Sequence, residues 1–368
     1  MEFLIMSILP YLPSLMRFVR GLAGAAVVFG SGMLVLVAQD AAPASDDAAL
    51  PAPPPPILDG YRADPDIRVF GDTYYIYPTS DKPNWNTTDF SCFSSKDLIH
   101  WKNEGMILDV AHNLSWANIK AWAPTAAMRD GKYYFYFVAN GQIGVATSDA
   151  PTGPFVDALG KPLIGKNDTP KTYPIDPDVF IDDDGQAYLF YGNGRLVAAK
   201  LKPDMISVDG EPADITPKDD ADKFREGVFV IKRKGLYYFM WSVDDARSEN
   251  YHVAYGIAHS PLGPIEIPPN NVILQKHGLA KGTGHHGVVN VPGTDRWYIV
   301  YHRHAIPNGN GYTREVCLNR MEFTDDGMIK PVDPLVTTFP PGSPGEPIID
   351  GKGSMTDPVG PADGSSSK

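Results

Sequence analysis

The sequence predicts an all-β fold, a five-bladed β-propeller, from three observations. A turn followed by an aromatic-rich run recurs five times along the chain. Successive recurrences start 59, 53, 50 and 60 residues apart, close to the period of a propeller blade built from four strands. Between Ile57 and Phe339 there is no sustained helical periodicity. Five such units predict five blades.

Each repeat reads as a tight turn that leads into a β-strand, because the runs are dense in Tyr, Phe, Trp, Val and Ile. In chain order the repeats are GDTYYIYPTS from Gly71, DGKYYFYFVAN from Asp130, DDGQAYLFYGNG from Asp183, RKGLYYFMWSV from Arg233 and GTDRWYIVYHRH from Gly293. A β-sandwich also has many short strands, but it would not repeat one hairpin at this period. Asp182 to Gly185 fits a hairpin turn and fails the spacing of an EF-hand calcium loop.

The two ends of the chain read as segments outside the propeller. Residues 1–44 combine two arginines, an apolar run of about 18 residues and the small-residue sequence Ala42-Pro43-Ala44, which predicts a signal peptide for export. We therefore expect an exported protein that is periplasmic or secreted. If the segment is not cleaved, it is expected to act as a membrane anchor. Residues 45–56 form a Pro/Ala-rich linker, residues 57–340 the propeller and residues 341–368 a Gly/Pro/Ser-rich tail.

The overall charge limits the possible partners. The net charge is −12 and the isoelectric point is near 5.1. This charge argues against nucleic acid, whose binding needs clustered Lys and Arg, and favours a neutral substrate. Cys92 and Cys317 lie far apart in sequence and show no metal-ligand spacing. They are expected either to form one disulfide or to be buried free thiols.

Acidic residues recur ahead of the repeated hairpins. If the innermost strand of each blade precedes its repeated turn, the residue seven to nine positions before the turn should face one mouth of the central channel. These residues are Asp64, Pro124, Asp176, Glu226 and either His285 or His286. Carboxylates that converge in one pocket repel each other unless chemistry or a cation requires them. Hydrolysis of a glycosidic bond needs such a set: an acid for the leaving oxygen and a carboxylate that activates water.

Each of these residues also has a structural explanation. An Asp-Pro pair often only starts a turn, which applies to Asp64 and Asp176. Glu226 beside Arg225 could be a solvated ion pair. The shared register across blades favours the functional interpretation, because unrelated turns have no reason to match.

Together these motifs resemble glycoside hydrolase family 43. The segments that carry the resemblance are Asp64-Pro65-Asp66, Trp122-Ala123-Pro124, Ile175-Asp176-Pro177-Asp178, Arg225-Glu226-Gly227 and Gly282-Thr283-Gly284-His285-His286. The resemblance implies a five-bladed propeller and a reaction that inverts the anomeric configuration. It also implies that Asp64 is the general base, that Glu226 is the general acid, and that Asp176 raises the pKa of the acid and orients it.

The resemblance also suggests the remaining site residues. His285 would lie near a central metal ion, commonly calcium, with contact through water because Ca²⁺ prefers oxygen ligands; a histidine that fills the propeller core is the alternative. Trp122 would form a platform beside the sugar ring, or else be a core aromatic. Arg314 would contact sugar hydroxyls, or else form a surface pair with Glu315. No organic cofactor and no protein partner are implied.

The expected substrate is a plant cell-wall oligosaccharide or polysaccharide. The stretches YPTSDKPNW and GTGHHGVV are most like the α-L-arabinofuranosidase branches of the family, which favours release of terminal α-L-arabinofuranose from arabinan or arabinoxylan. The alternatives are a β-D-xylosidase or another exo-acting member of the family, and a non-catalytic sugar-binding propeller. A retaining, invertase-like enzyme is disfavoured because Asp64 lies in the context Arg62-Ala63-Asp64-Pro65-Asp66.

Overall fold

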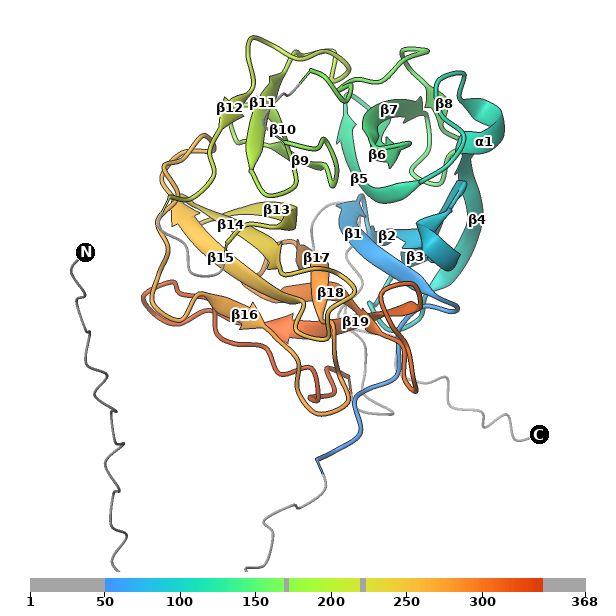
Figure 1. Cartoon of the computed structure of the whole chain (residues 1–368). Coiled ribbons are helices and arrows are strands. Elements are labelled where there is room, and N and C mark those ends of the chain that lie inside the picture. The colour runs from blue at the N-terminus through green and yellow to red at the C-terminus, as the bar shows by residue number, and fades with distance from the viewer. Residues whose placement is uncertain (1–49, 169–171, 219–222, 340–368) are drawn as a thin grey trace, which may run out of the picture. The chain divides into compact units, whose positions relative to one another are not determined.

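Five small antiparallel sheets form a ring in the computed structural model, which describes residues 50–168, 172–218 and 223–339 (Figure 1). This arrangement confirms the predicted all-β, five-bladed β-propeller. The predicted signal or anchor (1–44), the first part of the linker (45–49) and the tail (341–368) lie outside the described residues. No helix within those described ranges is long and apolar enough to cross a membrane.

The strands of each blade follow one another in chain order, and Figure 1 shows β1, β5, β9, β13 and β17 nearest the centre of the ring. Blade 1 contains β1 (Arg62–Phe70), β2 (Thr73–Ser80), β3 (Asp89–Ser95) and β4 (Lys102–Asp109); blade 2 contains β5 (Trp122–Arg129), β6 (Lys132–Ala139), β7 (Gln142–Ser148) and β8 (Val156–Asp157); blade 3 contains β9 (Asp178–Ile181), β10 (Ala187–Tyr191), β11 (Val197–Leu201) and β12 (Ala213–Asp214); blade 4 contains β13 (Glu226–Arg233), β14 (Leu236–Val243), β15 (His252–Ala258) and β16 (Val272–Leu274); blade 5 contains β17 (Gly284–Asn290), β18 (Trp297–His304) and β19 (Arg314–Met321). The short helices η1 (Pro83–Trp85) and α1 (Val110–Asn113) lie in connections.

The repeated hairpin is the link between the first and second strand of each blade. The turn at Gly71 joins β1 to β2, and Asp182 to Gly185 joins β9 to β10 through a backbone bond from Gly185 N–H to the carbonyl of Asp182 (2.9 Å). The innermost strand therefore runs just before the repeated turn, as the sequence predicts. Neighbouring inner strands contact one another around the ring, which brings their first residues together.

Aromatic side chains of the second strands fill the spaces between blades. Phe135 of β6 packs against Tyr77 and Phe90 of blade 1, and Phe239 of β14 packs edge-on against Phe190 of blade 3. Burial of each such ring contributes about 1.5–3 kcal/mol, which explains why the repeats are aromatic. Cys92 and Cys317 are buried free thiols in separate core clusters, which decides the alternative left open by the sequence.

The N-terminal part of the described chain closes the ring. Blade 5 has three named strands, and the backbone N–H of Ile57, just ahead of β1, donates to the carbonyl of Val316 in β19 (2.8 Å). Leu58 is buried in the same cluster as Val316. The first and last blades are thus joined by both hydrogen bonding and apolar packing.

A partly buried arginine links the inner strands of four blades. Arg68 of β1 pairs with Asp66 (2.9 Å) and with Asp178 at the start of β9 (2.6 Å), and it donates to the hydroxyl of Thr125 in β5 (2.7 Å). Its guanidinium also lies 4.9 Å from the ring of Phe229 in β13. The centre of the propeller therefore contains a polar network that joins the inner strands of blades 1 to 4.

Candidate active site

At or near the start of each inner strand lies a residue in the left-handed backbone conformation. These residues are Asp64 (φ 47°), Ala123 (37°), Asp176 (55°), Gly227 (62°) and His285 (39°). In β1, β5, β13 and β17 the pairing register shifts at this point, as in a β-bulge. Bulges redirect side chains and are common beside active sites, and a left-handed non-glycine residue costs about 1–3 kcal/mol. The bulges in β1 and β17 therefore turn Asp64 and His285 toward one point, and Asp176 lies just ahead of β9 in the same left-handed conformation.

Glu226 occupies a different register from the other two acids. The left-handed position of its blade belongs to Gly227, so Glu226 precedes it by one residue. The prediction of equivalent positions is correct for Asp64 and Asp176 and wrong by one residue for Glu226. A side chain at Gly227 would also press on its neighbours, because a Cβ there would lie 3.1 Å from the ring of His285 and from Oγ of Ser242. Glycine at this place lets blades 4 and 5 approach.

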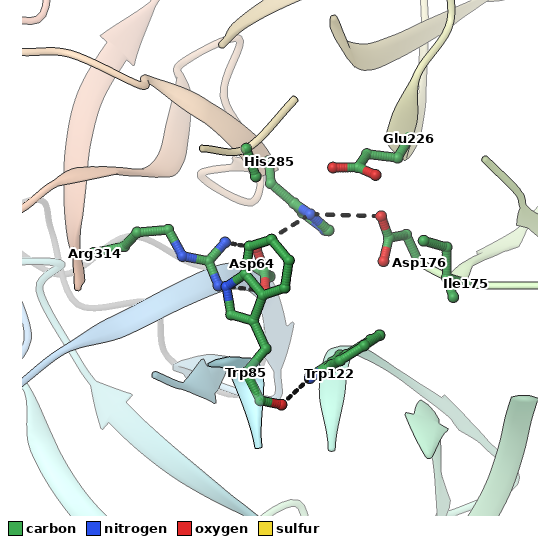
Figure 2. Close-up of a pocket in the computed structure, with 9 residues that line it drawn as sticks. Asp64, Trp85, Trp122, Ile175, Asp176, Glu226, His285 and Arg314 are labelled. Atoms are coloured by element: carbon green, nitrogen blue, oxygen red, sulfur yellow. Dashed lines mark hydrogen bonds and ion pairs between the residues drawn. The ribbon is translucent and has the colours of Figure 1, made fainter. Parts of the chain in front are cut away.

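The predicted site residues converge in one pocket of about 480 Å³ (Figure 2). The pocket is lined by Asp64, Trp85, Trp122, Ile175, Asp176, Glu226, Ala246, His285 and Arg314. All six residues singled out from the sequence are among them. Carboxylates from three different blades therefore share one small cavity.

Asp64 is surrounded by nitrogen atoms. Its Oδ1 lies 2.7 Å from Nη1 of Arg314, 3.3 Å from Nδ1 of His285 and 3.2 Å from Nδ1 of His302. Burial alone would raise the pKa of Asp64, but Arg314 and the two histidines outweigh it and hold the pKa well below its usual range. This carboxylate stays ionised near neutral pH, as a general base requires.

Glu226 has the opposite character. Burial raises the pKa of Glu226 to about 7, against the opposing effects of Arg225 and of a hydrogen bond from Tyr251. The hydroxyl of Tyr251 donates to Oε1 (3.0 Å), and the amide of Asn193 donates to Oε2 (2.7 Å). Near neutral pH this carboxyl can carry a proton and give it up, as a general acid requires.

Asp176 and His285 lie beside these two groups. Burial, together with the charges of Glu226 and Asp64, raises the pKa of Asp176 well above its usual range. Figure 2 shows the imidazole of His285 between Asp64 and Asp176, with Nδ1 3.3 Å and 3.8 Å from the two carboxylates. Burial lowers the pKa of His285, which favours a neutral ring.

The structure distinguishes the two adjacent histidines. His285 lines the pocket, whereas His286 is buried against Phe229 with a ring-centroid distance of 6.1 Å. Both ring nitrogens of His286 lack a hydrogen-bond partner among the described residues, and burial lowers its pKa to about 3. The bulge at His285 turns that residue, and not its neighbour, toward the site.

The described side chains do not fit a calcium site made of direct protein ligands. Ca²⁺ takes about six to eight oxygen ligands, and the oxygens in contact with the His285 ring belong to Asp64 and Asp176. Within the described ranges no group of three His, Cys, Asp or Glu side chains is arranged to hold a metal ion. A water-mediated calcium ion stays a prediction, and the catalytic steps proposed below do not depend on it.

Two tryptophans form one wall of the pocket. The indole N–H of Trp122 donates to the carbonyl of Trp85 (2.7 Å), as Figure 2 shows, and the indole N–H of Trp85 donates to the carbonyl of Gly311 (2.7 Å). The ring of Trp85 also packs on Tyr312 at 4.7 Å. Trp85 therefore ties the loop after β2 to blades 2 and 5, and Trp122 is a pocket residue.

Arg314 is buried, so the alternative of a surface pair with Glu315 is wrong. Glu315 pairs with Arg303 at 2.7 Å. Arg314 instead joins Asp64 to Asp81: its Nε and Nη2 bind the two oxygens of Asp81 at 2.9 and 2.7 Å. This two-point contact with Asp81 holds the guanidinium of Arg314 in position against Asp64.

Sequence reasoning missed five residues that shape the site: Asp81, Trp85, Asn193, Tyr251 and His302. Trp85 had a usable signal, because an aromatic residue in an exposed-looking loop between strands often marks a binding site. Asp81 resembles an ordinary turn residue, and Tyr251 and His302 resemble core residues of aromatic strands. Their roles depend on contacts between blades, which a single hairpin does not show.

Comparison with known proteins agrees with this geometry. Residues 54–329 match the model of "Glycosyl hydrolases family 43". The chain is 36% identical over 293 residues to the β-D-galactofuranosidase xynD of Aspergillus niger, covering 76% of this chain and 84% of that protein. It is 30% identical to xylosidase/arabinosidase 43A of Humicola insolens, covering 75% and 98% of the two chains.

A solved structure extends the comparison to three dimensions. The α-L-arabinofuranosidase of Clostridium thermocellum superposes with a TM-score of 0.62 at 32% identity, over 73% of this chain and 93% of that one. The family model spans well over half of the chain and includes all the pocket residues from Asp64 to Arg314. The chain therefore belongs to glycosyl hydrolases family 43.

Proposed function

We propose that this glycosidase is an inverting α-L-arabinofuranosidase that releases terminal arabinofuranose from arabinan or arabinoxylan. One observation supports the acid–base chemistry above all others. A single pocket contains Asp64, whose pKa is held low by Arg314 and two histidines, and Glu226, whose pKa is raised by burial to about 7. Two carboxyl groups with pKa values pushed apart can act as base and acid at the same pH.

In the proposed mechanism Asp64 removes a proton from a water molecule, which attacks the anomeric carbon. Glu226 donates its proton to the glycosidic oxygen as the bond between that oxygen and the anomeric carbon breaks. Each proton is thereby accounted for, and attack from the face opposite the leaving group inverts the configuration. Asp176 is assigned to orienting Glu226, and the guanidinium of Arg314 keeps Asp64 ionised.

The pocket favours action on chain ends. Its volume is modest, and the linked pair Trp85 and Trp122 limits it on one side. A continuous polysaccharide would need an open groove instead. Indole faces beside the acids suit the apolar face of a sugar ring, so we assign Trp85 and Trp122 to the terminal sugar.

The choice of arabinofuranose rests on the sequence stretches that resemble arabinofuranosidases and on the Clostridium thermocellum and Humicola insolens relatives. Hydrolysis of β-D-xylosides is the alternative, and the Humicola insolens relative supports it because its name includes both sugars. The Aspergillus niger relative favours a further candidate, β-D-galactofuranose. That sugar has the ring configuration of α-L-arabinofuranose plus one exocyclic carbon, so the same pocket could accept both.

The experiment compares p-nitrophenyl α-L-arabinofuranoside, β-D-xylopyranoside and β-D-galactofuranoside with wild type and Glu226→Gln. We expect the highest kcat/KM on the arabinofuranoside, and a loss of about 10²–10⁴-fold when the general acid is removed. Glu322→Gln is the matched control, because Glu322 is exposed and pairs with Lys330 at the surface. Preference for either other glycoside would replace the proposed sugar. Normal turnover by Glu226→Gln would contradict the acid role.

A further inference from the structure

A buried tyrosine of blade 4 contacts the proposed general acid of the same blade. Tyr251, one residue ahead of β15, is 0% exposed, and its hydroxyl donates to Oε1 of Glu226 at 3.0 Å. Tyr251 does not line the pocket. We propose that Tyr251 is a positioning residue that holds the carboxyl of Glu226 for proton transfer to the leaving oxygen.

The ring of Tyr251 is fixed by two strands of blade 5. It stacks on the imidazole of His302 in β18 with a centroid distance of 5.6 Å and an angle of 6°. On another side it rests on Gly284 of β17, where any Cβ would overlap the tyrosine ring. The hydroxyl therefore cannot swing away from Glu226 without repacking blade 5.

The same stack connects the acid to the base. Nδ1 of His302 lies 3.2 Å from both the backbone N and the Oδ1 of Asp64. One line of contacts thus runs from Glu226 through Tyr251 and His302 to Asp64. It fixes the position of the acid relative to the base, which an acid–base pair needs for a reaction at one bond.

A second donor completes the support of the carboxyl. Asn193, in the connection after β10, donates its amide N–H to Oε2 of Glu226 at 2.7 Å. Both oxygens of the acid therefore receive one hydrogen bond, from blades 3 and 4. Donors to a carboxylate favour its ionised form, and the hydrogen bond from Tyr251 opposes the effect of burial on the pKa of Glu226.

Other charged groups also face Glu226 and must stay constant in any test. Arg225, the residue just before β13, lies 3.9 Å from Glu226. The others, on neighbouring elements that line or border the pocket, are Asp64, Asp176, Asp245, His285 and Arg314. Replacing Tyr251 with phenylalanine leaves all of them in place. It removes the hydrogen bond to Glu226 and the one shared with the hydroxyl of Ser242, and it keeps the ring on His302.

The inference rests on the proposed acid role of Glu226, but it does not depend on which sugar is bound. In Tyr251→Phe the pKa of Glu226 should rise, because its ionised form loses a donor. We expect the alkaline limb of kcat/KM against pH to move upward by about one unit. We also expect the loss of rate to depend on the leaving group: small for a dinitrophenyl glycoside, which needs little protonation, and at least tenfold larger for a methylphenyl glycoside.

Tyr255→Phe is the matched control. Tyr255 lies on β15 and is equally buried, but its hydroxyl contacts Met328 and the backbone of Ile329, away from the pocket. A general weakening of blade 4 would affect both variants, whereas the limb shift and the leaving-group dependence should appear only in Tyr251→Phe. Asn193→Ala tests the same carboxyl if Tyr251→Phe fails to fold, and it should move the alkaline limb in the same direction.

The outcomes separate the inference from the proposed function. If wild type has an alkaline limb near pH 7 and the limb is unchanged in a folded Tyr251→Phe or Asn193→Ala variant, the positioning role is wrong. An equal loss on both leaving groups would contradict it as well. If wild type hydrolyses none of the three glycosides, the proposed function fails first. Activity on the xyloside or galactofuranoside changes the sugar only, and the test proceeds on that substrate.

Discussion

Replacement of Arg314 by methionine tests how the site keeps its base ionised. Arg314 is buried between two carboxylates, Asp64 at 2.7 Å and Asp81 at 2.7 Å, and the Asp81 side chain is 0% exposed. Methionine is similar in length but leaves both acids without their cation. Removing one partner of a buried ion pair costs about 3–5 kcal/mol, so we expect the free energy of unfolding to fall by at least that amount.

The dependence on pH follows from the direction of the Asp64 shift. The pKa of Asp64 is lower in the folded protein than in the unfolded chain. The ion pair therefore stabilises the fold fully above the unfolded pKa, and this stability is lost as the pH falls through the folded pKa. The difference between wild type and Arg314→Met should be full at pH 7 and should shrink below about pH 4.

The assay is urea unfolding of both proteins between pH 3 and pH 7, with Arg320→Met as control. Arg320 lies on the same strand, is 41% exposed and is 3.9 Å from Glu322. Its loss should cost under about 1 kcal/mol. The acid limb of activity should also move to higher pH in Arg314→Met, because the pKa of Asp64 rises. Equal stability of the two variants, or a difference that does not change with pH, would refute this account.

Three further substitutions test the fold and the pocket. Arg68→Met leaves Asp66 and Asp178 unpaired at the propeller centre and should cost about 3–5 kcal/mol in urea unfolding; a loss below 1 kcal/mol would show that the network is not needed. Trp85→Ala removes a pocket wall and should raise KM more than it lowers kcat, since wall contacts serve both ground and transition states; an unchanged KM would exclude Trp85 from the sugar site. Asp64→Asn removes the proposed base and should lower kcat by about 10²–10⁴-fold without unfolding detected by circular dichroism; residual turnover above a tenth of wild type would contradict that role.

The fold could be predicted because each blade repeats its local chemistry. A turn followed by an aromatic strand can be recognised within about ten residues of sequence. The motif recurs because each blade needs aromatic side chains to pack against its neighbours. The convergence of Asp64 and Asp176 could be predicted for the same reason, since both open an inner strand.

The finer geometry depends on backbone conformation that composition does not reveal. A bulge in β17 turns His285 rather than His286 toward the pocket, and a bulge in β13 places Glu226 one residue out of register. Both bulges are visible only in the dihedral angles and the strand pairing. Asp81 could not be found because its partner, Arg314, is 233 residues away in sequence. Tyr251 could not be found because it reads as a core aromatic and its partner lies 25 residues earlier.

The most direct test of the central claim is the stereochemistry of hydrolysis. Because Asp64 is proposed to activate water and Glu226 to protonate the leaving oxygen, the sugar should be released with inverted configuration. Proton NMR of the anomeric signal during the first minutes of hydrolysis of the preferred aryl glycoside records this outcome before the product equilibrates. A first product with the anomeric configuration opposite to that of the substrate is the predicted result. A first product with the substrate's own configuration would mean a covalent intermediate and would contradict the assignment of Asp64 as general base.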